Sequence, residues 1–374
     1  MKYDNFFSDD VASFMRSPVR EIFKKVDLAA IYSFAGGYPD AATFPTEDIR
    51  RISAEVLEKY GAKALQYGAT QGVPELRAVV AERCGVAVEN VQITTSSQQG
   101  IDVCTRVLVN PGDIVLTTAP TYLGALQSFK SYRADIRTLE DYGWEKPVKF
   151  CYVIPDFQNP SGETMTLEER KKLVALAREH DFLIVEDSPY RELRYSGEPV
   201  PTIYSLAPER TLFLGSFSKV FAPGFRLGWI LGAPELLDQI YVCKQSLDLC
   251  PPVFDQYIAA EFMGSGALDA NLQKSIALYR AKRDKMLGLL EQYMPEGVSW
   301  TRPEGGLFLF VTLPEGFDTV ALYDRALSAG VAYVAGSFFY PDGSHRNTMR
   351  VNFSFLDASR MEAGVKLLAE VIGQ

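Results

Sequence analysis

One short segment of the chain carries an amine, hydroxyls and a guanidinium in close succession. It runs from Ser216 through Ser218 and Lys219 to Arg226, and it follows the apolar residues 211–214. A primary amine can condense with an aldehyde, and partial burial lowers its pKa so that a useful fraction is uncharged and nucleophilic. The hydroxyls and the guanidinium suit a phosphate, since each charge-assisted hydrogen bond contributes about 1.5–3 kcal/mol. The segment therefore has the groups that would hold a phosphorylated aldehyde as a Schiff base, which implies pyridoxal 5′-phosphate. Alone, it could equally be a surface lysine after a strand.

Two adjacent carboxylates end a second apolar run. Residues 182–185 lead into Glu186 and Asp187. In an open parallel sheet, ligands bind beyond the carboxyl ends of the strands, so we expect Asp187 beside the Lys219 segment. A carboxylate about 4 Å from a pyridine nitrogen contributes about 4 kcal/mol at an effective dielectric constant of 20, or about three pKa units. That shift keeps the ring protonated at neutral pH and able to accept electrons. The alternative is that Asp187 only caps the next turn.

An asparagine follows a third apolar run. Asn159 stands before Pro160 and after residues 151–155. A residue before proline avoids helical geometry, so this amide can project from a strand end toward the phenolic oxygen of the cofactor. Tyr190 could reach the same oxygen. An Asn-Pro-Ser-Gly sequence is also a common turn, which is the alternative interpretation.

A fourth segment joins an expected strand to an expected helix. Residues 91–94 are followed by small polar residues and then by a helical pattern over residues 101–108. This order places free backbone N–H groups and the positive end of a helix at one point, which suits a phosphate. Ser97 and Gln98 would be the donors. An ordinary capped helix would show the same pattern.

Together these four segments resemble the fold-type I pyridoxal-phosphate aminotransferases of class I/II, in the branch that contains kynurenine and 2-aminoadipate aminotransferases. The resemblance extends from about Ser17 to Ser354. It implies that Lys219 forms the Schiff base, that Asp187 pairs with the pyridine nitrogen, and that Asn159 and Tyr190 bind the ring oxygen. It also implies a phosphate site made by polar residues of two segments, namely Ser97, Gln98, Ser216, Ser218 and Arg226.

The same resemblance assigns two tyrosines. Tyr122, in an Ala-Pro-Thr-Tyr sequence, corresponds to the catalytic-site aromatic that stacks on the cofactor ring. Tyr67 resembles the tyrosine that reaches a phosphate in the neighbouring subunit, which implies a homodimer.

Substrate contacts are also implied by the resemblance. Arg350 matches the arginine that binds the α-carboxylate of the substrate, with Asn159 and Gly37 beside it. Arg20 begins what resembles the mobile N-terminal helix of the 2-aminoadipate and kynurenine enzymes and matches an arginine used for a distal carboxylate. A surface arginine opening a solvated helix is the alternative for Arg20.

The elements that must position these residues alternate between strands and helices, which indicates a parallel sheet covered on both faces. We expect an α/β protein of the fold-type I class, with a mostly parallel central sheet and a smaller α+β C-terminal domain. The predicted divisions are an N-terminal segment (1–40), a large cofactor domain (41–265) and a small domain (266–374). Thr166 and Glu169 form a predicted capping box. Residues 137–149 are shorter than in relatives, so we expect a crossover helix to be missing there.

Composition agrees with a chain of this kind. The 374 residues are 47% apolar, and the net charge of −9 argues against binding to nucleic acid or to an anionic membrane. Five cysteines without metal-type spacing and two histidines predict reduced core thiols and no metal site. A signal peptide pattern is not seen at the N-terminus, so a cytoplasmic location is expected.

The resemblance implies transfer of an α-amino group by alternating half-reactions, a ping-pong mechanism. An acidic or aromatic amino acid is the expected donor and 2-oxoglutarate the expected acceptor. A related lyase, cyclase or decarboxylase could use the same cofactor site. The sensor half of certain transcription regulators shares the fold, but only about 30 residues precede Phe34, too few for their DNA-binding domain. A nucleotide-binding Rossmann enzyme is disfavoured because no Gly-x-Gly-x-x-Gly follows an expected strand.

Overall fold

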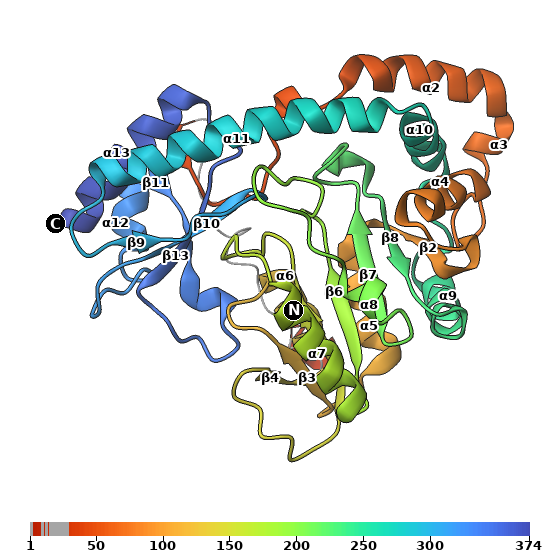
Figure 1. Ribbon diagram of the computed structural model, residues 1–374, viewed down its shortest axis with the longest axis horizontal. Helices are drawn as coiled ribbons and strands as arrows, with labels where there is room; N and C mark the ends of the chain where they lie inside the picture. Colours follow the sequence, from red (N-terminus) through yellow and green to blue (C-terminus); the bar gives the residue numbers. More distant parts are fainter. Residues whose placement is uncertain (1–2, 9–10, 12–13, 15–29) are drawn as a thin grey trace.

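The computed structural model describes residues 3–8, 11, 14 and 30–374. Arg20 lies outside the described residues. Within them, a seven-stranded sheet forms the centre of the larger part of the molecule (Figure 1). Its spatial order is β2 (Val91–Thr94), β8 (Gly228–Leu231), β7 (Thr211–Ser216), β6 (Leu183–Asp187), β5 (Val148–Val153), β3 (Ile114–Thr117) and β4 (Asp135–Thr138). Only β8 runs antiparallel to its neighbours, so the prediction of a mostly parallel sheet is confirmed.

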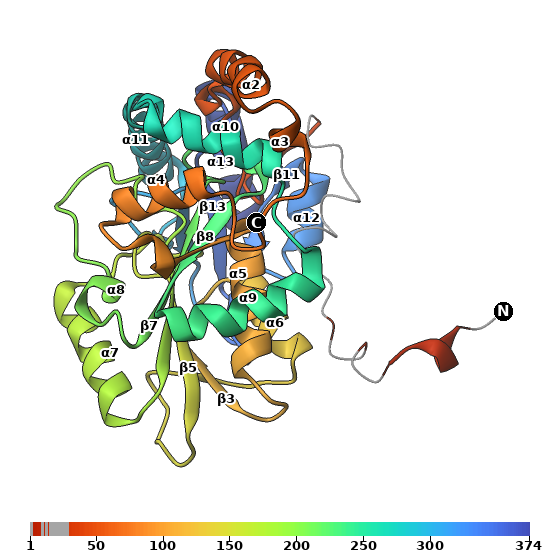
Figure 2. The ribbon, with the colours of Figure 1, turned by 90° about the vertical axis from the view of Figure 1, so that its right-hand side faces the viewer.

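Helices cover both faces of this sheet because its strands are apolar on both sides (Figure 2). One face packs against α5 (Ser96–Leu108), α6 (Leu123–Ser131) and α9 (Pro234–Asp248). The opposite face packs against α7 (Leu167–Glu179) and α8 (Ile203–Leu206). On β6, Ile184 belongs to the α7 side and Val185 to the α5 side, which is the alternation expected of a strand buried on both faces.

A second group of helices and a smaller sheet complete the chain. Helices α2 (Thr46–Tyr60), α3 (Ala62–Leu65), α4 (Pro74–Cys84) and α10 (Val253–Gly264) pack together, and the long α11 (Ala267–Tyr293) leads from them to the C-terminal part (Figure 1). There an antiparallel sheet has the order β12 (Val334–Ala335), β13 (Thr348–Asn352), β10 (Phe308–Thr312) and β9 (Ser299–Trp300). Helices α12 (Tyr323–Ser328) and α13 (Ala358–Gly373) belong to the same part of the chain and contact each other.

The apolar residues 331–335 predict one continuous strand in the C-terminal part, and this prediction is wrong. The segment is divided at Tyr333 into β11 (Val331–Ala332) and β12, which pair with different strands in different sheets. The partner of β11 is β1 (Tyr32–Ser33), so the described part of the N-terminal segment pairs with the C-terminal part of the chain. The Tyr333 hydroxyl donates to the Thr319 carbonyl at 2.6 Å, which fixes the chain at the point of division. The domain boundaries at 40 and 265 stay predictions.

Two local expectations are confirmed. Thr166 and Glu169 form the reciprocal capping box at the start of α7. The chain passes from β4 to β5 through residues 139–147 without a helix, so the shortened region does lack a crossover helix.

The cysteine prediction is right only in part. All five thiols are free, and Cys104 and Cys151 are buried in the core. Cys84, Cys243 and Cys250 are partly exposed because they lie at the end of α4, on α9 and just after it. No helix of the described chain combines the length and apolar character needed to cross a bilayer.

Candidate active site

A cavity of about 1120 Å³ lies at the carboxyl ends of the parallel strands of the large sheet, beside the C-terminal part of the chain. Five loops or helix starts reach it, because β2, β3, β5, β6 and β7 all present their carboxyl ends there. The predicted residues that line it are Gly37, Ser97, Gln98, Tyr122, Asn159, Asp187, Tyr190, Ser216, Ser218, Lys219, Arg226 and Arg350. Tyr67 is not among them; its side chain is 79% exposed in this single chain.

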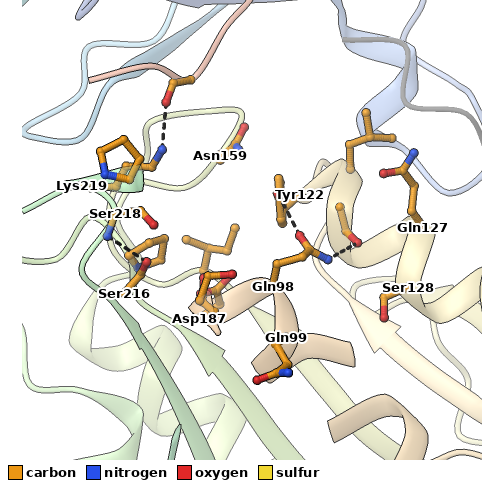
Figure 3. A pocket seen from close by; sticks show the side chains of 18 of the residues that line it. Gln98, Gln99, Tyr122, Gln127, Ser128, Asn159, Asp187, Ser216, Ser218 and Lys219 are labelled. Carbon is orange, nitrogen blue, oxygen red and sulfur yellow. Dashed lines mark hydrogen bonds between the residues drawn. The ribbon is translucent and has the colours of Figure 1, made fainter. Parts of the chain in front are cut away.

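The Lys219 amine lies inside this cavity (Figure 3). Its Nζ donates a hydrogen bond of 2.8 Å to the Gly37 carbonyl. Burial, together with the charges of Arg350 and Arg226, lowers the pKa of Lys219 to about 8. At neutral pH a useful fraction of this amine is therefore uncharged and able to act as a nucleophile or a base.

Asp187 ends β6 and is only 2% exposed. The Tyr152 hydroxyl donates to its Oδ2 at 2.7 Å, while Oδ1 is buried and meets no partner among the described residues. Burial raises the pKa of Asp187 to about 7, and the Tyr152 bond opposes this shift. Sequence reasoning missed Tyr152, which reads as one apolar residue of a strand. Its role depends on the β5–β6 register, in which Tyr152 pairs with Val185.

Arg350 is buried, with only 4% of its surface exposed, and its guanidinium makes three kinds of contact. Its Nη1 donates to Asn159 Oδ1 at 2.8 Å and its Nη2 to the Ala35 carbonyl at 2.6 Å. The guanidinium also lies 4.2 Å from the centre of the Phe308 ring. Its Nε is buried and has no partner within the described part of the chain. Burial lowers the pKa of Arg350 to about 10, so it remains cationic at neutral pH.

The first turn of α5 meets the loop after β7 at the other end of the cavity. Ser96 adopts a left-handed backbone (φ 70°), and its Oγ accepts a 2.6 Å hydrogen bond from Arg226 Nη2. The Ser218 N–H donates to Ser216 Oγ at 3.1 Å. Gly228 permits this approach, because a Cβ there would lie 2.7 Å from the Ser97 nitrogen. Ser96 was not predicted, since nothing in the sequence reports its unusual backbone.

Gln98 and Tyr122 lie together at the cavity wall (Figure 3). The Tyr122 hydroxyl donates to Gln98 Oε1 at 3.1 Å, and Gln98 Nε2 donates to the Gly124 carbonyl at 3.1 Å. The Gln98 side chain is thus already engaged, and its backbone N–H is the donor left for an anion in the first turn of α5.

These residues fit pyridoxal phosphate. The unpaired Asp187 Oδ1 suits a protonated ring nitrogen, the Lys219 amine suits an aldehyde, and Arg226 with the α5 N-terminus suits a phosphate. Nowhere in residues 30–374 or the shorter described stretches do three or more potential metal-ligating side chains gather.

The family model for aminotransferase class I and II matches residues 35–368. The chain belongs to this family. Aromatic-amino-acid aminotransferase 1 of Thermococcus litoralis is 45% identical to it, over 100% of this chain and 95% of that protein. The kynurenine aminotransferase of Pyrococcus horikoshii, whose crystal structure contains PMP and KYN, is 44% identical to this chain in sequence. The two structures superpose with a TM-score of 0.95 over 100% of this chain and 98% of that one.

A third relative carries a phosphopyridoxyl derivative of an amino acid in its structure. An α-aminoadipate aminotransferase of Thermus thermophilus, complexed with N-(5′-phosphopyridoxyl)-L-leucine, is 35% identical with a TM-score of 0.94, covering 100% of this chain and 98% of that one. The present aminotransferase is accordingly a pyridoxal-phosphate-dependent transaminase that acts on small amino and oxo acids. The predicted fold class, cofactor and enzyme class are confirmed.

Proposed function

We propose that this aminotransferase moves the α-amino group of an acidic or aromatic amino acid to a 2-oxo acid such as 2-oxoglutarate, by a ping-pong mechanism. The relatives support the donor class: their names specify aromatic amino acids, kynurenine and α-aminoadipate. The observation that carries the proposal is the pairing, in one cavity, of the Lys219 amine with the buried Arg350 guanidinium. Such a pair can hold a substrate carboxylate and move a proton beside it.

Pyridoxal phosphate, when bound, supplies an aldehyde for the amino group and a ring that takes up the electrons of the Cα–H bond. Asp187 keeps the ring nitrogen protonated through Oδ1, and Tyr152 orients that carboxylate. Asn159 and Tyr190 bind the ring oxygen, and Tyr122 covers one ring face. The phosphate is held by Ser97, Gln98, Ser216, Ser218 and Arg226.

Lys219 acts as the proton carrier. Its Nζ would accept the proton that leaves the substrate α-carbon and would donate it to the carbon that the cofactor aldehyde supplies, and a pKa of about 8 permits both transfers near neutral pH. Arg350 binds the substrate carboxylate with the donors it does not share with Ala35 and Asn159, and Gly37 lies beside this site. Arg20 binds the distal carboxylate of acidic donors.

The enzyme is proposed to act as a homodimer in which Tyr67 reaches the phosphate of the neighbouring subunit. The 79% exposure of Tyr67 in the single chain supports this, because a partner would cover it. Leu65, nearby, is 71% exposed.

The test is the Lys219→Ala enzyme with a panel of donors: glutamate, 2-aminoadipate, kynurenine and phenylalanine. Turnover should fall by about 10²–10⁴-fold or more for every donor, because the proton carrier is gone. Borohydride should fix the cofactor covalently to the wild type at Lys219 and leave the variant unlabelled. Lys172→Ala, which removes an exposed lysine of α7, is the matched control.

Product analysis decides between transamination and other chemistry. Wild-type enzyme should convert each accepted donor other than glutamate to its oxo acid, in amounts equal to the glutamate formed from 2-oxoglutarate, with parallel double-reciprocal plots. A main product that has lost the α-carboxylate or a side-chain substituent would contradict the proposal. An active Lys219→Ala enzyme would also contradict it.

A further inference from the structure

Two loops that carry residues assigned above to the cofactor ring leave the large sheet side by side. The loop after β3 carries Tyr122, and the loop after β5 carries Asn159. Both side chains lie at the cavity wall (Figure 3). The two strands are parallel neighbours, with Thr117 opposite Tyr152. The hydrogen bonds of the sheet end with the strands, so the spacing of the two loops depends on contacts between the loops themselves.

The side chain of Gln158 supplies such contacts. Its Nε2 donates to Thr118 Oγ1 at 2.9 Å and to the Pro120 carbonyl at 2.9 Å. A carbonyl oxygen only accepts hydrogen bonds, so the amide nitrogen must face the β3 loop. Both acceptors come shortly before Tyr122 in the chain, and Gln158 is the residue before Asn159. One amide group therefore joins the loop of Tyr122 to the loop of Asn159.

The oxygen of the same amide is engaged as well. Gln158 Oε1 accepts from Ser161 Oγ at 2.6 Å, within its own loop. The Ser161 carbonyl in turn accepts from Thr301 Oγ1 at 2.6 Å, which ties this loop to the C-terminal part of the chain. The loop of Tyr122 reaches the same part, because the Thr121 N–H donates to the Phe339 carbonyl at 2.8 Å. Both N–H groups and the oxygen of Gln158 thus have partners, and these partners fix its orientation.

Resting on the roles proposed above for Tyr122 and Asn159, we propose that Gln158 is a positioning residue for the cofactor ring. It sets the distance between the two loops, so that Tyr122 covers the ring face while Asn159 reaches the ring oxygen. Gln158 is not among the described residues that line the cavity. It therefore acts through its neighbours and does not touch the cofactor itself.

The test is Gln158→Met, which keeps a side chain of similar length and removes its donors and its acceptor. The affinity of the apoenzyme for pyridoxal phosphate should fall by about tenfold or more, because the two hydrogen bonds that join the loops are lost. The pH midpoint of the absorption change of the bound cofactor should rise by about 0.5–1 unit, because a misplaced Asn159 stabilises the anionic ring oxygen less well. Both quantities are read by absorbance titration and need no turnover.

A second variant breaks one of these hydrogen bonds from the other loop. Thr118→Val deletes the hydroxyl that accepts from Gln158 and leaves the Pro120 carbonyl in place, so cofactor affinity should fall by about threefold. In Thr118→Val/Gln158→Met the two losses should not add, because both changes break the same hydrogen bond. Full additivity would overturn the proposal. If Gln158→Met gives no folded protein, Thr118→Val still decides, because an unchanged affinity and midpoint there would contradict the role of Gln158.

Asn90→Ala is the matched control. Asn90 Nδ2 donates to the Gly232 carbonyl at 2.9 Å, which joins the chain before β2 to the chain after the neighbouring β8. This link lies at the amino end of β2, away from the cavity. Its loss should lower the Tm and leave the cofactor affinity and the pH midpoint unchanged. A Gln158→Met enzyme that behaved in the same way would have lost only a structural contact, which would refute the proposal.

The outcomes also separate this inference from the proposed function. If the wild type does not bind pyridoxal phosphate at Lys219, the proposed function fails. If the wild type binds it and the Gln158→Met enzyme binds it equally tightly with the same pH midpoint, the role of Gln158 is refuted while the proposed function stands.

Discussion

Asp187 and Glu186 are consecutive carboxylates whose side chains point to opposite faces of β6. Glu186 is fully buried, and its Oε2 accepts from the Tyr204 N–H on the α8 side at 2.7 Å. Burial raises the pKa of both groups to about 7. Only Asp187 lines the cavity, so the alternation of the strand decides which of two similar acids can meet the cofactor.

The raised pKa of Asp187 predicts a pH dependence of apoprotein stability. The folded-state value, about 7, lies above the ordinary value of 3.8, so the folded protein holds a proton that the unfolded chain has released. This stabilisation is complete below pH 3.8 and is lost as the pH rises to about 7. The Asp187→Asn variant has a neutral amide at this position, so it loses no stability by ionisation as the pH rises. Without cofactor, the Tm of the variant minus that of wild type should grow by several degrees between pH 4 and pH 8.

Scanning calorimetry at several pH values measures this difference. Asp141→Asn, the same change at an exposed position outside the cavity, is the matched control. A Tm difference for Asp187→Asn that does not change with pH would contradict the prediction.

The junction of β8 with the start of α5 depends on one residue that has no side chain. At Gly228 a Cβ would lie 2.7 Å from the Ser97 nitrogen and 2.8 Å from the Gly215 carbonyl oxygen. Real Cβ atoms do not approach backbone this closely, so the elements would have to move apart. Gly228 thus sets the distance between β8 and the turn proposed to hold the phosphate.

Gly228→Ala should therefore weaken cofactor binding and folding together. We expect a loss of about 1–3 kcal/mol in stability, as for overpacking of a core, and a lower affinity for pyridoxal phosphate. Gly288→Ala, where nothing lies within 4 Å on α11, should instead be neutral or slightly stabilising, because alanine favours a helix interior. Urea titration and cofactor titration of both variants test this, and an unchanged Gly228→Ala enzyme would contradict it.

Most elements of the large sheet could be predicted because each is a short apolar run followed by a polar cluster. β7 and β6 were expected at residues 211–214 and 182–185, and they extend to Ser216 and Asp187. What could not be predicted depends on pairings between distant residues. The Tyr152–Asp187 bond requires the β5–β6 register, the Gln158–Pro120 bond spans 38 positions, and the division at Tyr333 follows from two competing partner strands.

The site joins the large sheet to both ends of the chain. The N-terminal segment supplies the Ala35 carbonyl to Arg350 and the Gly37 carbonyl to Lys219. That segment is itself anchored to the C-terminal part, where Ser354 Oγ donates to the Tyr38 carbonyl at 2.7 Å and Lys282 of α11 pairs with Asp40. The substrate binding proposed for Arg350 would therefore depend on the packing of the two parts against each other.

The proposed homodimer extends this dependence to a second chain, and Tyr67 provides the test. Mixed dimers can be made by co-expressing differently tagged chains, one with Tyr67→Ala and the other with Lys219→Ala. If Tyr67 serves the neighbouring site, the chain that keeps Lys219 receives an intact Tyr67 from its partner. Each mixed dimer then has one complete site, and its activity at limiting cofactor should be about half that of wild type.

The reciprocal mixed dimer is the control for this experiment. A chain carrying both Tyr67→Ala and Lys219→Ala, paired with a wild-type chain, should be weakly active at limiting cofactor, because the remaining Lys219 site faces a partner without Tyr67. The loss should correspond to about 1.5–3 kcal/mol of cofactor binding, the contribution of one hydrogen bond to a charged phosphate. If Tyr67 served its own chain, the two kinds of mixed dimer would exchange their activities: the first would be weak and the second would retain one complete site.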